Sequence, residues 1–313
     1  MAFRNYLQVR GLMHDRKGDQ RSAPTPGDRH MRTITICAAA TLLGTVALPA
    51  AATSSASASV GPLQIQLFDL DVSDGITPGI TFETGLSSLV AADAYSSVSG
   101  KSSGEVRQGA DQFEPLNVSG SVAGASASAA ISGTGAALGT SVTLSGSASP
   151  GGQGSARYRA EATLPLRKDL TTFTLTPNTV VVFTTFAQIA TSVVDLSPSS
   201  TAVTHATASI RLTFGGDPAE IPTTSTGGAE TLYSTITAVP GGSASESFAR
   251  TIGASYLNPS ATTTRRGTLQ LDMWVSGQSE ITPVPEPSAA SLAVAGLGML
   301  GWVLCRRRDA RRG

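Results

Sequence analysis

The sequence predicts an all-β protein, folded as an antiparallel β-sandwich of jelly-roll or immunoglobulin-like kind. Only 14% of the 313 residues are charged and 5% are aromatic, while serine, threonine, alanine and glycine dominate, a composition typical of extracellular β-proteins. Many short segments alternate apolar and polar residues, which is the period of a half-buried strand. Glycine and proline turn signals separate them at intervals of roughly 15–20 residues, as in antiparallel sandwiches.

The first expected strand spans residues 64–70, where Ile65 and Leu67 share one face. Residues 82–98 are ambiguous, because they fit either a further strand or a short helix around 86–94.

The segment 119–149 consists almost entirely of serine, glycine, alanine and threonine. Such a composition fits a flexible linker, but the near-alternation at 141–145 favours closely packed strands of small residues. A strand follows at 156–166, with one face formed by Tyr158, Ala160, Ala162 and Leu164.

The clearest predicted strand pair joins residues 171–176 to residues 180–186. The turn signal Pro177-Asn178 lies between them, and the second segment is rich in β-branched and aromatic residues. We therefore expect a hairpin here. Further strands are expected at 202–214, 229–239, 247–257 and 266–277.

Charge and cysteine usage exclude several classes of function for residues 53–287. Subtracting the residues outside this range (7 basic and 3 acidic before it, 5 basic and 1 acidic after it) from totals of 22 each leaves 10 basic and 18 acidic residues, a net charge of −8. Such a surface repels nucleic acid and anionic lipid. Both cysteines, Cys37 and Cys305, lie outside the range, and His205 is its only histidine. A disulfide framework, a thiolate zinc site and a two-histidine metal site are therefore excluded.

A weak calcium candidate is the acidic loop of Asp69, Asp71 and Asp74. The loop lacks the spaced acidic ligand that closes an EF-hand. We expect these residues to be solvated acids at a strand end, with no metal and no cofactor bound.

Catalytic arrangements are poorly supported by the sequence. His205 and Asp195 could form a triad with one of many serines, but no Gly-x-Ser-x-Gly elbow is present, and an outward polar side chain is the ordinary explanation for His205. A glycosidase needs two carboxylates at a set distance, and the sequence does not fix the distance between any of its candidates. These candidates are Asp217 with Glu220, and Glu105, Asp111 and Glu114. An aromatic platform for sugar rings could use only Trp274, Tyr233, Tyr256 or Tyr158, and Trp274 is expected to be a core residue or an edge-strand anchor.

The chain ends in three successive features. Pro285-Glu286-Pro287 precedes the uncharged run 289–305, and Arg306, Arg307 and Arg308 begin a basic cluster at 306–312. Seventeen residues span about 25 Å as a helix, slightly short of a hydrocarbon core of about 30 Å, and arginine side chains can make up the difference. The arginines hold this end in the cytoplasm by the positive-inside rule, which leaves the rest of the chain outside.

This tail resembles the PEP-CTERM sorting signal of Gram-negative bacteria, and the resemblance covers residues 285–313, about the last 30. It implies that Pro285, Glu286 and Pro287 are read by exosortase, a membrane transpeptidase-like enzyme. It also implies that the span and Arg306, Arg307 and Arg308 retain the protein in the inner membrane until it is processed.

The N-terminal region predicts a secretory signal peptide at residues 31–52. A short basic start, an apolar stretch at 34–48 and the small residues Ala50 and Ala52 indicate cleavage by signal peptidase before Thr53. Cleavage before Ser59 is the fallback. Residues 1–30 fit only an extended n-region or a start codon placed too early.

The predicted organisation is therefore a signal peptide, a β-domain at 53–277, a linker at 278–284 and the sorting signal. We expect a non-enzymatic protein of the cell surface or extracellular matrix, with exopolysaccharide as a candidate partner. The alternative is a secreted glycosidase or esterase acting on polysaccharide.

Overall fold

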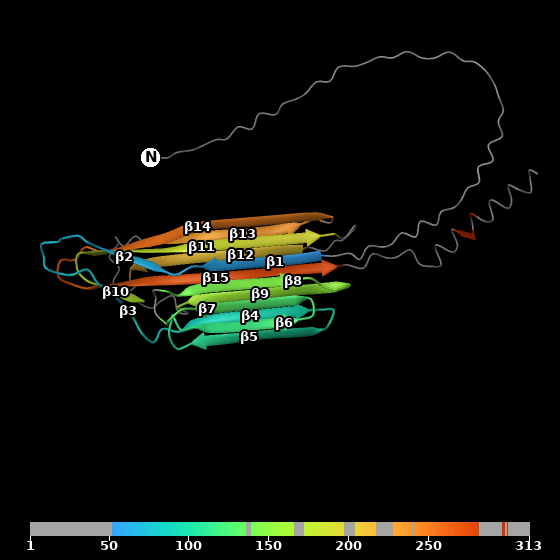
Figure 1. Ribbon diagram of the computed structural model, residues 1–313, viewed down its shortest axis with the longest axis horizontal. Helices are drawn as coiled ribbons and strands as arrows, with labels where there is room; N and C mark the ends of the chain where they lie inside the picture. The colour runs from blue at the N-terminus through green and yellow to red at the C-terminus, as the bar shows by residue number, and fades with distance from the viewer. Residues whose placement is uncertain are drawn as a thin grey trace, which may run out of the picture. The chain divides into compact units, whose positions relative to one another are not determined.

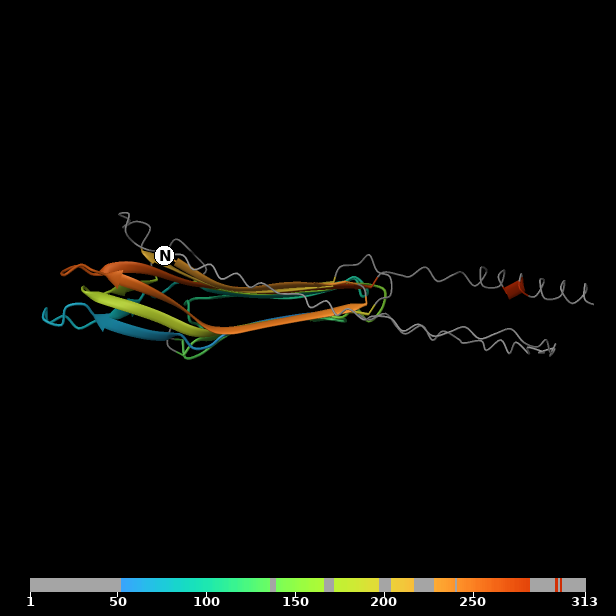
Figure 2. The ribbon, with the colours of Figure 1, turned by 90° about the horizontal axis from the view of Figure 1, so that it is seen from above.

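Two facing antiparallel sheets form the described part of the protein (Figure 2). The computed structural model describes residues 52–135, 139–165, 172–196, 204–216, 228–239 and 241–281, together with Gly296, Leu297 and Met299. Its fifteen strands exceed the roughly seven to nine of a jelly roll or immunoglobulin domain. The prediction of an all-β antiparallel sandwich is confirmed.

Sheet 1 contains seven strands and sheet 2 contains eight. In spatial order, sheet 1 consists of β14 (Gly242–Asn258), β11 (Thr179–Asp195), β1 (Ala52–Val60), β8 (Ser141–Ala148), β7 (Ala125–Ser132) and β6 (Leu116–Val122), with β2 (Gln64–Asp69) also paired to β11. Sheet 2 consists of β13 (Gly228–Ala238), β12 (Thr204–Gly216), β15 (Arg265–Ile281), β9 (Gly154–Leu164), β4 (Ser88–Ser96) and β5 (Lys101–Gly109), while β10 (Phe173–Leu175) pairs with β15 and β3 (Ile80–Phe82).

The strands of the two sheets face one another in nearly the same order. β14 packs against β13, β11 against β12, β1 against β15, and β8 against β9. β1 begins and β15 ends at the same end of the sandwich (Figure 1). The chain therefore enters and leaves the domain at one end.

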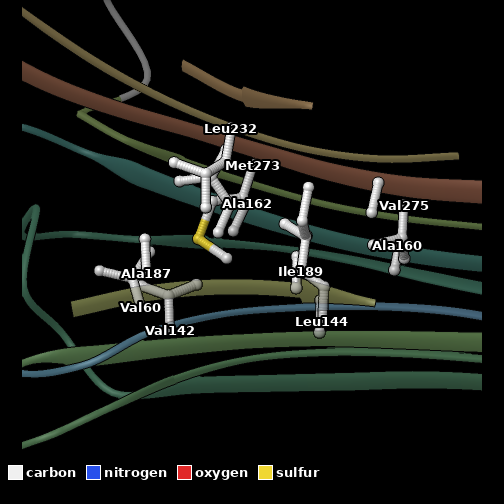
Figure 3. Close-up of a cluster of buried hydrophobic side chains, with 14 of the residues drawn as sticks. Val60, Val142, Leu144, Ala160, Ala162, Ala187, Ile189, Leu232, Met273 and Val275 are labelled. Carbon is white, nitrogen blue, oxygen red and sulfur yellow. The ribbon is translucent and has the colours of Figure 1, made fainter. Parts of the chain in front are cut away.

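The core lies between the sheets and is built from aliphatic side chains of modest size (Figure 3). Val142, Leu144 and Ile189 of sheet 1 meet Met273 and Val275 of sheet 2. A cluster of aromatic rings closes the core farther from the chain ends, with Phe82, Phe173, Phe183 and Tyr256 in contact.

Small residues form regular strands in sheet 1. Along β7, buried alanines alternate with serines that point outward. Segment 119–149 therefore contains strands, as the alternation predicted.

On the outer face of sheet 1, two rows of residues cross six strands and consist of serine except at Ala190. They are Ser245, Ser192, Ser55, Ser147, Ser126 and Ser121, followed by Ser247, Ala190, Ser57, Ser145, Ser128 and Ser119.

Two expectations about the elements need correction, and one open alternative is decided. Residues flanking Pro177-Asn178 do not form a hairpin, because β10 lies in sheet 2 and β11 lies in sheet 1. Asn178 has a φ of 49°, and the turn carries the chain between the sheets. Of the two structures left open for residues 82–98, the strand is the one that forms, as β4 at Ser88–Ser96. β15 continues to Ile281, so the first four residues of the predicted linker belong to the sheet.

Tyr158 should make the domain sensitive to alkaline pH. Its hydroxyl is buried and makes no hydrogen bond of good geometry with the described residues. Burial raises the pKa of Tyr158 above its ordinary value of 10.0, and the nearby Ser54 side chain opposes this with a smaller effect. The unfolded chain loses this proton near pH 10 while the folded chain keeps it. The free energy of unfolding should therefore fall by about 1.4 kcal/mol per pH unit as pH rises above 10.

Replacing Tyr158 with phenylalanine removes this titration and the buried hydroxyl. We expect Tyr158→Phe to be at least as stable as the unaltered protein at pH 8, and more stable at pH 11. Urea unfolding at the two pH values measures the difference, and an identical loss of stability in both proteins would contradict the prediction.

Candidate functional site

An open hollow of about 630 Å³ lies on the outer face of sheet 2. Three neighbouring strands, β9, β12 and β15, supply its floor and walls. We call it the tryptophan hollow. Its lining includes Arg159, Glu161, Thr163, Ser209, Arg211, Asp272, Trp274 and Ser276.

Two exposed aromatic rings lie beside each other here: Trp274 lines the hollow, and Tyr233 lies next to it on strand β13. The strand register places Ser209 of β12 opposite Tyr233 of β13 on one side and opposite Trp274 of β15 on the other. Residues directly opposite in antiparallel strands point to the same face. The ring centroids of Tyr233 and Trp274 are 6.4 Å apart, with the planes inclined by 53°. The rings remain 54% and 37% exposed, while Ser209 between them is only 7% exposed.

Charged groups of both signs surround the rings. Arg159 donates a hydrogen bond from Nη2 to Glu161 Oε2 at 2.6 Å. Asp272 lies directly opposite Arg211 in the strand register and accepts a hydrogen bond from Gln270 Nε2 at 3.1 Å. Glu161 is thus bound to a guanidinium, and Asp272 has an arginine directly opposite it on the neighbouring strand. The hollow offers hydrogen-bond donors and acceptors beside exposed aromatic surface.

The sequence prediction for Trp274 was wrong. Trp274 lies on an interior strand of sheet 2 and points outward, so it is neither a core residue nor an edge anchor. Of the other platform candidates, Tyr233 joins it, whereas Tyr158 and Tyr256 are buried in the core. Strand alternation shows that Trp274 lies on the opposite face from its chain neighbours Met273 and Val275. It does not show which of the two faces of the strand is covered by the other sheet.

His205 and Asp195 are not brought together. Thr204 and Ala206 are buried on the inner face of sheet 2, so His205 between them points outward. Asp195 is fully buried at the end of β11 in sheet 1. The triad arrangement is absent, and the ordinary explanation of His205 fits the structure.

The other candidate carboxylates serve local structure or lie outside the described residues. Glu105 pairs with Arg107 at 2.7 Å. Glu114 accepts a hydrogen bond from the Ala110 amide at 2.6 Å, and Asp111 accepts one from the Phe113 amide at 3.2 Å. Asp217 and Glu220 lie outside the described residues.

The acidic loop after β2 uses its carboxylates to hold its own backbone. Asp69 accepts a hydrogen bond from the Asp71 amide at 2.9 Å, and Asp74 accepts one from the Ile76 amide at 2.6 Å. Hydrogen bonds from the hydroxyl and amide of Ser73 lower the pKa of Asp71. The described parts of the chain contain no group of three metal-ligating side chains.

The predicted targeting residues lie almost wholly outside the described residues. These are Ala50, Pro285, Glu286, Pro287, Arg306, Arg307 and Arg308, whereas Ala52 is the first residue of β1. Within the predicted span at 289–305, Gly296, Leu297 and Met299 are helical. No helix within the described residues is long and apolar enough to cross a membrane.

The fold and the hollow define a large antiparallel β-sandwich with an aromatic and charged outer face. Residues 283–308 match the family model of the PEP-CTERM protein-sorting motif, which confirms the resemblance at this end of the chain. The motif implies export, a membrane-anchored C-terminus before processing, and exosortase as the processing enzyme. No curated protein and no solved structure matches the chain.

Proposed function

We propose that this exported protein is not an enzyme and binds a polysaccharide of the cell surface or biofilm matrix through the tryptophan hollow. The observation that carries the proposal is the pair of exposed rings, Tyr233 and Trp274, 6.4 Å apart beside the hollow. The sorting motif at 283–308 supports the location of such a partner, because it directs the chain out of the cytoplasm.

The chemistry of the hollow suits an uncharged sugar polymer. Aromatic rings offer apolar surface on which the faces of sugar rings can stack, and paired carboxylates and guanidinium groups bind hydroxyls. Arg159 and Arg211 balance Glu161 and Asp272, so the hollow favours neither cations nor anions. The open shape leaves room for a chain that continues past both ends.

The position of the chain ends supports a domain that is displayed close to the membrane before processing. β1 begins and β15 ends at one end of the sandwich (Figure 1), and only three residues separate Ile281 from Pro285. Signal cleavage before Thr53 would keep β1 almost whole, whereas cleavage before Ser59 would remove most of an interior strand. We infer that signal peptidase cleaves after Ala52.

One observation favours the alternative of a glycosidase. Asp272 lies opposite Thr163, two residues from Glu161 on the same strand, so the two acids are diagonal neighbours about 7–8 Å apart at Cα. Catalytic carboxyl groups of glycosidases are separated by about 5–10 Å. Glu161, however, is paired with Arg159 at 2.6 Å, and a proton-donating acid would have to leave that pair. Binding without cleavage therefore remains the preferred function.

Substitution of Trp274 tests the binding proposal. We expect Trp274→Ala to weaken binding to the preferred member of a panel of neutral polysaccharides by at least about tenfold, as for an aromatic residue central to an interface. Affinity electrophoresis and calorimetry measure the loss. Phe186→Ala is the matched control, because Phe186 is an exposed aromatic residue on the outer face of sheet 1. Equal binding by both variants and the unaltered protein would refute the assignment.

The same polysaccharide distinguishes binding from hydrolysis. Release of reducing ends by the unaltered protein, lost in both Glu161→Gln and Asp272→Asn, would establish the glycosidase instead. Binding without any release of reducing ends supports the proposed function.

A further inference from the structure

The outer edge of β14 is a long strand edge with exposed side chains. β14 runs for 17 residues and pairs only with β11 among the described strands. Residues 246–251 are exposed on both faces of the strand, and Phe248 is 49% exposed. A strand edge of this length presents unpaired backbone groups to which another strand can bind.

The backbone of β14 determines which residues can make such bonds. The amide of Gly253 donates to Glu230 Oε2 of β13 at 3.2 Å and therefore points away from β11. Successive amides of a strand point to alternate sides, so the odd-numbered residues 247, 249 and 251 also face the free edge. If the added strand is a second β14, each odd-numbered residue must therefore lie opposite an odd-numbered residue of the second copy, so that their backbone groups can form hydrogen bonds.

The sequence around Phe248 complements itself in one such register. Centring an antiparallel pair of β14 strands on Phe248 places Glu246 opposite Arg250 of the second copy, and Arg250 opposite Glu246. Ser247 then lies opposite Ala249, and both are odd-numbered edge residues. Phe248 lies opposite Phe248 in a position without backbone hydrogen bonds, where side chains approach most closely. The two chains are related by a twofold axis, as in most homodimers.

We propose that the protein forms a homodimer in which the β14 strands of two copies pair antiparallel about Phe248 and join two copies of sheet 1 into one continuous sheet. Residues 242–254 overlap in this register, and to pair with Ser243 of the second copy the Gly253 amide must leave Glu230 Oε2. The complementary charges select a second copy of this chain over any other strand.

There is space for the partner's side chain at this edge. Glu246, Phe248 and Arg250 lie opposite Thr191, Ile189 and Ala187, which point to the inner face of sheet 1. Beside them, β13 and β14 enclose a hollow of about 300 Å³ lined by Thr231, Leu232, Tyr233, Phe248, Ala249 and Arg250. The second Phe248 would enter the space between the sheets near this hollow.

The charged groups already make contacts within one copy. Glu246 Oε2 accepts a hydrogen bond from the Ser234 hydroxyl at 2.8 Å, and Arg250 Nη2 donates to the Thr231 carbonyl at 3.2 Å. A carboxylate has a second oxygen and a guanidinium has five N–H donors. Both groups can therefore keep these contacts and also bind across the dimer.

A cysteine at the dimer axis tests the register directly. In the full chain carrying Cys37→Ala and Cys305→Ala, no other cysteine is present. Phe248→Cys should then form a disulfide on mild oxidation and run at twice the chain mass on a non-reducing gel. Residues facing each other without backbone hydrogen bonds have Cα atoms about 4.5 Å apart, within the range of about 4.4–6.8 Å for disulfides.

Ser255→Cys is the matched control on the same strand. Ser255 is exposed, but the two copies of residue 255 would lie roughly 45 Å apart along the paired strands. This variant should stay monomeric on the same gel. Phe248→Cys that remains monomeric while its thiol reacts with maleimide would overturn the proposal.

Charge reversal provides a second, independent measurement. Glu246→Arg and Arg250→Glu each place two like-charged pairs at the interface and should weaken association by about tenfold or more in analytical ultracentrifugation. The double variant Glu246→Arg with Arg250→Glu restores both pairs and should restore the dimer. The proposal fails if the unaltered chain sediments as a monomer, or if the single variants associate as tightly as it does.

Discussion

Replacing Pro285, Glu286 and Pro287 with alanine should leave the full chain in the inner membrane at its unprocessed size. The motif at 283–308 marks the chain for exosortase, and the sequence predicts that its two prolines disfavour helix in the recognition segment. Three alanines would remove the recognised side chains and favour helix at the start of the span. Cell fractionation with immunoblotting measures the ratio of membrane-bound to released protein, which we expect to change from mostly released to almost entirely retained.

The control for this experiment is Thr282→Ala, a substitution between the end of β15 and the matched motif. It should be processed like the unaltered chain. If the triple-alanine protein were released at the processed size in the usual amount, Pro285-Glu286-Pro287 would not be the recognition element. Loss of the protein from every fraction would show degradation, and pulse labelling would then follow processing before the chain is lost.

The strand pattern could be predicted where the sequence alternates. The inward face of β9, with Tyr158, Ala160, Ala162 and Leu164, was predicted from its period and is buried as expected. The same period at 141–145 indicated β8 and favoured strands over a flexible linker in segment 119–149, although the composition of small residues fits both. Alternation of alanine inward with serine outward is what separates a strand from a linker in such a segment.

The pairing of strands could not be predicted from local pattern. A turn such as Pro177-Asn178 predicts a change in direction, but a change of sheet looks the same in sequence as a hairpin. The observed outcome depends on β10 pairing with residues 265–267 of β15, almost a hundred positions away along the chain. Contacts at that distance leave no local signal.

The tryptophan hollow was missed for a related reason. Trp274 alternates with Met273 and Val275, both of which are buried, but the strand period by itself does not show which of the two faces is covered. The sequence could name Trp274 and Tyr233 only as two of four possible platform residues, together with Tyr158 and Tyr256. The approach of Tyr233 through Ser209 requires the register of three strands, which only the structure supplies.

The two outer faces of the sandwich differ in a way that bears on function. The outer face of sheet 1 carries rows of serine, with hydroxyl pairs such as Ser126 with Ser147 at 2.9 Å and Ser128 with Ser145 at 2.8 Å. Such a face is polar and carries no charge along these rows. Phe68 and Phe186 are also exposed on strands of sheet 1. The adjacent rings of Tyr233 and Trp274 and the Arg159–Glu161 ion pair lie on sheet 2, which is why we assign binding to that sheet.

Gly146 should be among the least replaceable residues of the domain, because the ring of Tyr158 occupies the place of its missing side chain. Gly146 belongs to β8 in sheet 1 and Tyr158 to β9 in sheet 2. A Cβ atom at position 146 would lie 2.0 Å from Cδ2 of Tyr158. The ring cannot withdraw freely, since its hydroxyl is also packed against Gly277, where a Cβ atom would lie 2.4 Å away.

We therefore expect Gly146→Ala to lower the free energy of unfolding by about 1–3 kcal/mol, the usual cost of overpacking a core. Thermal unfolding of the purified protein should show a melting temperature lower by about 2–4 °C for each kcal/mol. Gly151→Ala is the control, because a Cβ atom there would meet nothing within 4 Å. It should leave stability unchanged or raise it slightly, since alanine restricts the unfolded chain.

A double substitution identifies the cause of the loss. Tyr158→Ala alone should cost about 3–5 kcal/mol, as for other large aromatic residues removed from a core. In that background, Gly146→Ala would fill part of the cavity and should be neutral or stabilising, so the effect of the same alanine changes from unfavourable to favourable. Equal destabilisation by Gly146→Ala in both backgrounds would mean that the backbone conformation at position 146, and not the Tyr158 ring, requires glycine.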